Sequence, residues 1–137
     1  MIFVDALFTM EASGAQAHAV GARNGHRWCH LFNDGPPEEL DVFAARLGLR
    51  FRWRDGDHYD LTPGRRTAAL RAGAVEAPTG SAAERSWSAR RHGGRKLRCR
   101  GCGFIAWVPA GGVAPASCPS CARTADRKST RLNSSHV

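Results

Sequence analysis

The chain has 137 residues, of which 42% are hydrophobic, and a formal net charge of +8. This length suits one small core with an appended module, and no run of about 18 apolar residues predicts a membrane-spanning helix. The charge is uneven, because residues 1–77 carry 9 basic and 10 acidic side chains, whereas residues 78–125 carry 8 basic and 1 acidic. We therefore expect a near-neutral domain followed by a cationic region.

The apolar start of the chain does not resemble a secretory signal. Asp5 interrupts it and no basic residue precedes it. We therefore expect a cytoplasmic protein that keeps its cysteines reduced. Metal binding is then the first interpretation of paired cysteines, ahead of disulfides.

Predicted strands and helices alternate along the first 77 residues. Residues 2–4 are β-branched and aromatic and predict a strand, residues 9–26 read as a loop, and residues 27–32 (RWCHLF) form a short apolar run of either type. Residues 49–54 alternate apolar side chains with arginines, which predicts a strand with one buried face. Residues 74–77 suit a final short strand.

Two helices are predicted from their ends. Pro36-Pro37 suit a helix entry, four apolar residues of the segment share one face, and Gly48 is a natural stop. Thr62-Pro63 marks a second helix start. The resulting βαβαβ order favours a small α/β domain of two or three layers, with a parallel sheet and crossover helices.

The rest of the chain divides into three parts. Residues 78–96 are polar, basic and rich in Gly and Ser, and predict a flexible linker in which Trp87 is either a loose aromatic or a base-stacking one. Residues 97–123 form a cysteine-rich module. Residues 124–137 predict a disordered tail, within which residues 126–136 (DRKSTRLNSSH) resemble a translated sequencing adapter and are excluded from fold reasoning.

The most specific motif is C-x2-C-x15-C-x2-C, formed by Cys99, Cys102, Cys118 and Cys121. Two such pairs can supply the four tetrahedral ligands of a structural zinc ion. The 15 residues between the pairs are long enough for a hairpin that bends at Gly111-Gly112. Residues 97–123 resemble the zinc-ribbon family, which implies a structural ion; two disulfides or a rubredoxin-type iron site are the alternatives.

Basic residues crowd the first arm of this module, which suits phosphate contact. A solvated surface or a protein-docking face would have the same composition, so nucleic acid and protein are both possible partners. The remaining cysteine, Cys29, reads as a small buried hydrophobe, although His26 and His30 nearby leave a nucleophilic role open.

Five polar side chains fall where predicted strands end or predicted helices begin: Asp5, His30, Asp34, His58 and Asp60. In a parallel sheet these positions share one edge, where α/β proteins bind ligands. Imidazoles and carboxylates together can bind a second divalent ion or perform acid–base chemistry. The structural alternative is that Asp34 and Asp60 cap helices and His58 is a hydrogen-bonded loop residue.

Residues 2–77 resemble the bacterial and phage family called domain of unknown function 4031. The resemblance rests on VD near the start, then RWCHLF-D---EEL--FAARLGL, then W-----HYDLT--RR--AL--GAVE. Residues 9–26 look longer and less regular than the corresponding segment of that family. The resemblance implies no activity, but it places six residues on motif positions: Asp5, His30, His58, Tyr59, Asp60 and Arg66.

These observations favour an enzyme-like module that acts on nucleic acid or a phosphorylated ligand. The expected catalytic residues are Asp5, His30, His58 and Asp60. Arg65 and Arg66 would hold an anionic group, and the ribbon would grip the polymer. The alternative is a non-catalytic adaptor or regulator in which the same polar residues form a structural network.

Overall fold

The computed structural model describes residues 1–9, 27–123 and 132–135. Its strands are β1 (Ile2–Asp5), β2 (Phe8–Thr9), β3 (Arg27–Asn33), β4 (Asp55–Gly56), β5 (Tyr59–Leu61), β6 (Val75–Ala77), β7 (Arg95–Cys99), β8 (Ile105–Val108) and β9 (Leu132–Ser135). Its helices are α3 (Pro37–Arg46), α4 (Pro63–Arg71) and α5 (Ala82–Arg91), with 3₁₀ turns η1 (Phe51–Trp53) and η2 (Cys121–Arg123). None of these helices is long and apolar enough to cross a membrane.

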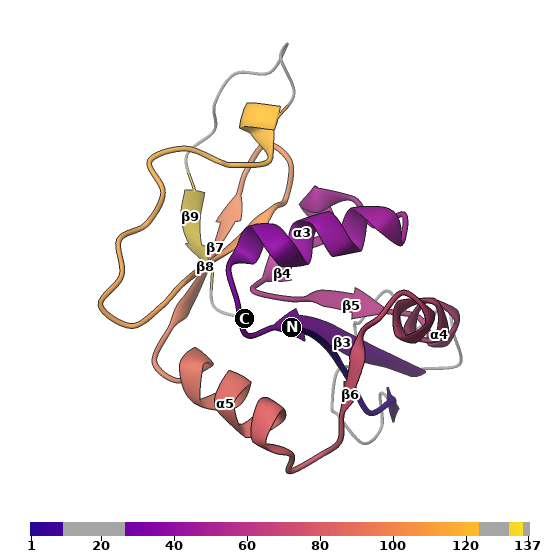
Figure 1. Cartoon of the computed structure of the whole chain (residues 1–137). Helices are drawn as coiled ribbons and strands as arrows, with labels where there is room; N and C mark the ends of the chain where they lie inside the picture. The colour runs from indigo at the N-terminus through magenta and orange to yellow at the C-terminus, as the bar shows by residue number, and fades with distance from the viewer. Residues whose placement is uncertain (10–26, 124–131, 136–137) are drawn as a thin grey trace.

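The fold is α/β, as expected, and its strands form two sheets. The first sheet has the order β2-β3-β1-β6, and β5 also pairs with β3. The second sheet has the order β4-β8-β7-β9. Figure 1 shows α3 and α5 on opposite sides of the first sheet.

The expected parallel sheet is wrong for most pairings. In the first sheet, β3 runs antiparallel to β1, β2 and β5, and the parallel pair described there is β1 with β6. β5–α4–β6 is a crossover of the expected kind, because β5 and β6 run in the same direction. The chain between β3 and β5 includes α3, and it brings β5 back beside β3 in the opposite direction. The first sheet is therefore mixed.

Strand alternation gives the first sheet two different faces. The Val4, Leu31 and Leu61 side chains belong to a core shared with α3 and α4. On the other face Phe3 and Phe32 pack against Trp87 of α5. Burial on both faces makes this the three-layer form of the predicted domain.

The two helices predicted from their ends are confirmed. α3 begins at Pro37 after the extended Pro36, and it is followed by Gly48 at φ +80°. α4 begins after Thr62, whose side-chain oxygen accepts a hydrogen bond from the Arg65 backbone N–H at 3.1 Å. The strand expected at residues 74–77 is also present as β6.

The strand expected at residues 49–54 is wrong, because residues 51–53 form η1. The aromatic Phe51 stacks on Phe104 of the cysteine-rich module at 4.8 Å, and the Arg54 guanidinium lies over both rings. Trp53 remains 45% exposed. The apolar and basic alternation therefore reflects packing against the module rather than one buried face of a strand.

The flexible linker expected at residues 78–96 is also wrong. Residues 82–91 form α5, and its Trp87 is 6% exposed against the first sheet. The side-chain oxygen of Ser81 accepts from the Glu84 N–H at 3.4 Å, and Glu84 accepts from the Gly80 N–H at 2.9 Å. These local bonds start a helix, and burial of the indole fixes it to the sheet.

The cysteine-rich module is joined to the rest of the protein by β4. This short strand pairs in parallel with β8, while β7 and β8 pair antiparallel. Gly56 of β4 has φ +70°, and a Cβ there would lie 3.3 Å from that of Trp107. The backbone therefore approaches the indole in a conformation that favours glycine.

Two further expectations concern the C-terminal part. A turn closes at Gly112, whose N–H donates to the Pro109 carbonyl at 2.9 Å, but β8 pairs with β7 rather than with a strand after the bend. Of the tail expected to be disordered, residues 132–135 form β9 on β7. Residues 124–131 and 136–137 lie outside the described residues, as does most of the loop expected at residues 9–26.

Candidate functional site

Cys99, Cys102, Cys118 and Cys121 come together at one end of the second sheet. Their sulfur atoms all lie within 4.8 Å of one another, and none of the chain's five cysteines forms a disulfide. Cys99 closes β7, and a tight turn follows in which the Gly103 N–H donates to the Cys99 carbonyl at 2.9 Å with Gly103 at φ +77°. This turn points the first pair of sulfurs at the second pair.

The sulfur separations fit a tetrahedral ion. Sγ of Cys99 and Cys121 are 3.8 Å apart, and Sγ of Cys102 and Cys118 are 3.6 Å apart. Four sulfurs about 2.3 Å from one ion would be separated by about 3.8 Å. Burial opposes ionisation of Cys99, yet backbone N–H groups of the turn bring its pKa down to about 7. The cluster can therefore hold a metal ion, and its geometry is consistent with zinc.

A second cluster lies on the face of the first sheet that α5 covers. His30 of β3 stands opposite Asp60 of β5, and His58 lies two residues before Asp60. One ligand atom from each of the three lies within 4.8 Å of the others. The two imidazoles meet at a centroid distance of 4.9 Å and an angle of 84°.

We call His30, His58 and Asp60 the histidine–aspartate cluster. Each of its two imidazoles is hydrogen-bonded to a different carboxylate. Nδ1 of His30 lies 2.6 Å from Oδ2 of Asp5, whose other oxygen accepts the His30 backbone N–H at 2.6 Å. Nδ1 of His58 lies 3.0 Å from Oδ1 of Asp57, whose other oxygen accepts from Nε1 of Trp87 at 2.9 Å. Both carboxylates therefore fix a ring orientation through Nδ1, which leaves Nε2 of each ring for other contacts.

The cluster is buried and strongly charged. Burial alone would lower the pKa of His58, but hydrogen bonds to Asp57 and Asp60, together with the charges of Asp60 and Asp55, raise it to about 9. Burial opposes ionisation of Asp57, yet His58 and Arg91 hold its pKa below the usual value. A histidine in this position keeps its proton unless another cation takes its place.

Two cations border the cluster. Nε of Arg91 lies 3.4 Å from Oδ1 of Asp57, and Nζ of Lys96 lies 2.9 Å from Oδ1 of Asp55. Arg91 belongs to α5 and Lys96 to β7. The helix and the second sheet therefore supply charges to a cluster built on the first sheet.

A cavity of about 290 Å³ adjoins His30. It is bounded by Asp5, Phe8, His30, Thr79, Glu84, Trp87, Ser88 and Arg91. The His30 side chain is 18% exposed, whereas that of His58 is 4% exposed. His30 is thus the member of the cluster that a ligand in this cavity would meet.

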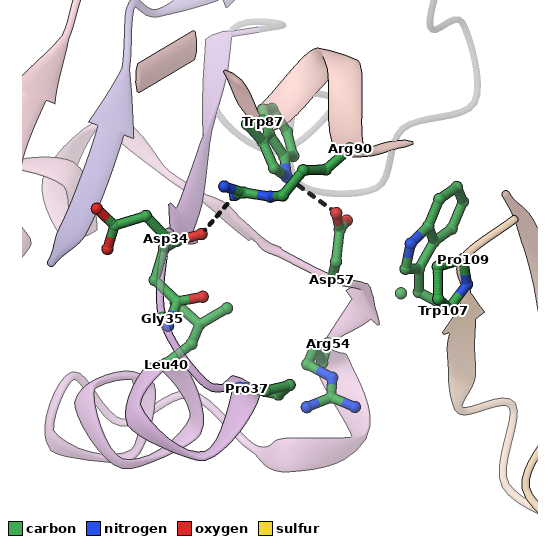
Figure 2. Close-up of a pocket in the computed structure, with 12 residues that line it drawn as sticks. Asp34, Gly35, Pro37, Leu40, Arg54, Asp57, Trp87, Arg90, Trp107 and Pro109 are labelled. Carbon is green, nitrogen blue, oxygen red and sulfur yellow. Dashed lines mark hydrogen bonds between the residues drawn. The ribbon is translucent and has the colours of Figure 1, made fainter. Parts of the chain in front are cut away.

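A second cavity, of about 300 Å³, separates the first sheet from the cysteine-rich module. Figure 2 shows Asp57 and the Trp87 indole on one side of it and Trp107 and Pro109 on the other. The Arg90 guanidinium, which also lines this cavity, donates to the Asn33 carbonyl at 2.8 Å. Asp57 therefore contacts His58 of the cluster and also lines the cavity next to the cysteine-rich module.

The predicted catalytic residues Asp5, His30, His58 and Asp60 are all brought together. They lie on a sheet face under α5 rather than along a strand-end edge, because β3 and β5 are antiparallel neighbours. Asp34 does not join them, since its carboxylate pairs with the N-terminal amino group at 2.7 Å.

The arginines expected to hold an anion lie elsewhere. Nε of Arg66 donates to the Asp5 carbonyl at 2.9 Å, and Nη2 pairs with Glu76 at 3.2 Å. The Arg65 guanidinium lies over the Trp53 ring at 5.6 Å. Tyr59, on a motif position of the resemblance, is buried in the other core and donates to Asp41 at 2.7 Å.

Asp57 and Arg91 are not among the site residues predicted from the sequence, and Trp87 is predicted only as a loose or base-stacking aromatic of a linker. The string DGDHYD at residues 55–60 places acidic residues on both sides of His58, which is a signal for Asp57. Ser81 followed by Glu84 three residues later is a helix-start pattern that could identify α5. Only the packing of α5 shows that its indole lies against both histidines and that the Arg91 guanidinium pairs with Asp57.

Comparison with known proteins identifies a family for this chain. The chain matches the model of a family described as "protein of unknown function (DUF4031)" over residues 16–89. No curated protein and no solved structure matches the chain. The match ends within α5, so it includes most of the helix that covers the histidine–aspartate cluster. Because it spans more than half of the 137 residues, the chain belongs to the DUF4031 family.

Proposed function

We propose that the protein acts on a phosphate ester, with nucleic acid as the polymeric ligand, through the histidine–aspartate cluster. The observation that carries this proposal is the convergence of His30, His58 and Asp60 beside an open cavity. Carboxylate-backed imidazoles are suited to moving a proton or holding an ion near reacting atoms. A lone structural histidine would need neither a second histidine nor the cavity.

The reaction would be hydrolysis. A water oxygen attacks phosphorus as the ester P–O bond breaks, and a proton passes from the water to the leaving alkoxide. Arg91, at the wall of the cavity, is placed to offset negative charge that develops on the phosphoryl oxygens. His30 lines the same cavity and would hold an ion near the reacting atoms, and Asp5 would fix the orientation of its ring.

Charge on the C-terminal half supports a polymeric ligand. Arg85, Arg90, Arg95, Arg98 and Arg100 are exposed. They lie on α5 and around β7, that is, on elements next to the cluster rather than on α3 or α4. Arginine contacts to successive phosphates bind nucleic acid without reading its sequence.

We also propose that the four-cysteine cluster holds zinc in a structural role. Four thiolates leave no open position for a substrate, and a unit of this size folds on its metal. Elemental analysis of the purified chain tests this assignment. About one zinc per chain bound through the four thiolates is expected, whereas iron at that cluster would favour the rubredoxin-type alternative.

Activity is tested with bis(p-nitrophenyl) phosphate and with single- and double-stranded oligonucleotides. His30→Ala is expected to lower kcat/KM by at least about 100-fold, because it removes the side chain through which the cluster meets the cavity. His92→Ala is the matched control, because His92 lies just beyond the end of α5 and outside the cluster. If the wild-type protein binds oligonucleotides but hydrolyses none of these probes, the adaptor alternative replaces this proposal.

Binding is tested separately by titrating salt against an oligonucleotide. The double variant Arg98→Gln, Arg100→Gln is expected to reduce the salt slope by about 1 for each arginine that touches a phosphate. Arg71→Gln, on the exposed side of α4, is the control. An affinity that ignores ionic strength would exclude phosphate contacts by these arginines.

A further inference from the structure

We infer that His30, His58 and Asp60 bind one divalent transition-metal ion, distinct from the ion of the four cysteines. The inference rests on the proposed function, because it assigns an ion to the same cluster. It begins with the donor set: two imidazoles and one carboxylate with ligand atoms within 4.8 Å of one another. Three protein ligands of these types are typical of catalytic metal sites that leave further positions open.

The separation between two of the ligand atoms fits coordination. Nε2 of His58 lies 3.4 Å from Oδ1 of Asp60. Two ligands about 2.1 Å from an ion, at the tetrahedral angle, would be about 3.4 Å apart. These atoms are therefore placed as neighbouring ligands of one ion.

The hydrogen bonds around the imidazoles select the ligand atoms. The Asp5 carboxylate is hydrogen-bonded to Nδ1 of His30, and the Asp57 carboxylate is hydrogen-bonded to Nδ1 of His58. A metal-bound histidine usually donates its other ring N–H to a carboxylate in this way, which fixes the tautomer and the ring orientation. Nε2 of each ring is then the ligand atom, and Asp5 and Asp57 are positioning residues. The Trp87 N–H in turn orients Asp57.

The local charge balance favours a divalent ion. Four carboxylates surround the two histidines: Asp5, Asp55, Asp57 and Asp60. The ion pairs with Arg91 and Lys96 offset two of these charges. The remaining two negative charges match one divalent cation. Imidazole donors favour zinc and its transition-metal neighbours over magnesium or calcium, which prefer oxygen alone.

The His30 side chain lies between aromatic rings and a cavity. The His30 ring is enclosed by Phe8, Trp28 and Trp87, with ring centroids 5.6, 4.7 and 5.2 Å away. His30 nevertheless lines the 290 Å³ cavity. An ion there could take water or a phosphoryl oxygen from the cavity, and it would supply the acidity that a neutral-pH hydrolysis of a phosphate ester needs.

The test counts ions in the folded full chain. Protein carrying zinc at the cysteines is titrated with Co²⁺, and bound metal is measured by elemental analysis together with visible absorption. Thiolate-to-cobalt charge transfer reports the cysteines, whereas ligand-field bands without it report nitrogen and oxygen ligands. Wild-type protein is expected to bind two ions per chain, one of them Co²⁺ without thiolate bands.

Two variants test the proposed ligands, a third tests a positioning residue, and a fourth is the control. His30→Ala and Asp60→Asn are expected to reduce binding to one ion per chain, while His92→Ala keeps two. Asp5→Asn is expected to weaken the second ion by about 10- to 100-fold, as loss of an orienting carboxylate does. Circular dichroism confirms that each variant is folded before its ions are counted.

Two results would overturn the inference. One is a folded wild-type chain that binds a single ion, at the cysteines, at saturating metal. The other is a second ion that persists with unchanged affinity in both His30→Ala and Asp60→Asn. Hydrolysis is measured independently, so binding of two ions without activity would refute the proposed function and leave the metal site standing.

Discussion

Trp87 serves two parts of the molecule at once. Its indole stacks on Phe32 at 4.3 Å and 9°, and its N–H holds the carboxylate that orients His58. The Arg91 guanidinium covers the same ring at 4.8 Å. One side chain therefore stabilises α5 on the sheet and connects that helix to the histidine–aspartate cluster.

The two roles of Trp87 can be separated by substitution. Trp87→Phe keeps a ring against Phe32 but leaves an Asp57 oxygen without its N–H donor, so it should cost about 1–3 kcal/mol of unfolding free energy. Trp87→Ala also empties the core site and should cost about 3–5 kcal/mol. Urea unfolding with zinc present measures both. Equal costs for the two variants would mean that the stacked ring contributes nothing beyond the hydrogen bond.

We expect the buried thiol of Cys29 to be unreactive in the folded protein. It is 0% exposed, and burial raises its pKa to about 12. In folded, zinc-loaded protein at pH 8 we predict that iodoacetamide leaves Cys29 unmodified, whereas in urea the thiol reacts. Peptide mass spectrometry reads both samples. Rapid alkylation in the folded protein would restore the nucleophilic interpretation.

At the scale of elements, local signals are sufficient for α3 and α4. Thr62-Pro63 and Gly48 act through their own backbone neighbours, so these signals can be read without the rest of the fold. The segments at residues 49–54 and 78–96 cannot be read in this way because their partners are distant in sequence. Phe51 packs on Phe104 and Trp87 on Phe32, and composition alone does not indicate such pairs.

The start of α5 provides a prediction at this scale. Ser81→Ala removes the side-chain acceptor for the Glu84 N–H and should lower the unfolding free energy by about 1 kcal/mol. Ser86→Ala, on the exposed side of the same helix, should stay within about 0.5 kcal/mol of wild type. Denaturant unfolding compares the two. The same loss of stability in both would show that the cap does not stabilise α5.

At the scale of the whole molecule, the cysteine-rich module is built into the candidate site. β4 pairs with β8, and the Lys96–Asp55 ion pair joins β7 to the strand that precedes His58. The sequence does predict that the four cysteines come together, and that Asp5, His30, His58 and Asp60 do so. It cannot predict that the cysteine-rich module holds the loop carrying His58, since no local pattern specifies a pairing between Asp55 and Ile105.

Removal of the ion that we propose at the four cysteines should therefore change the structure beyond the module. Chelation is expected to raise amide hydrogen exchange at residues 95–108 and at residues 55–58 together, because the proposed metal would supply the folding energy of the module with which β4 pairs. Exchange in α3 and α4 should change little. Faster exchange confined to residues 95–123 would mean that the first sheet holds β4 without the module.

The second metal centre that we infer at the histidine–aspartate cluster can be located in a crystal. Anomalous diffraction at the zinc absorption edge, from crystals of the full chain grown with zinc, tests it most directly. We predict two peaks per chain, one enclosed by the four cysteine sulfurs and one among His30, His58 and Asp60. A single peak, at the cysteine sulfurs, would contradict it.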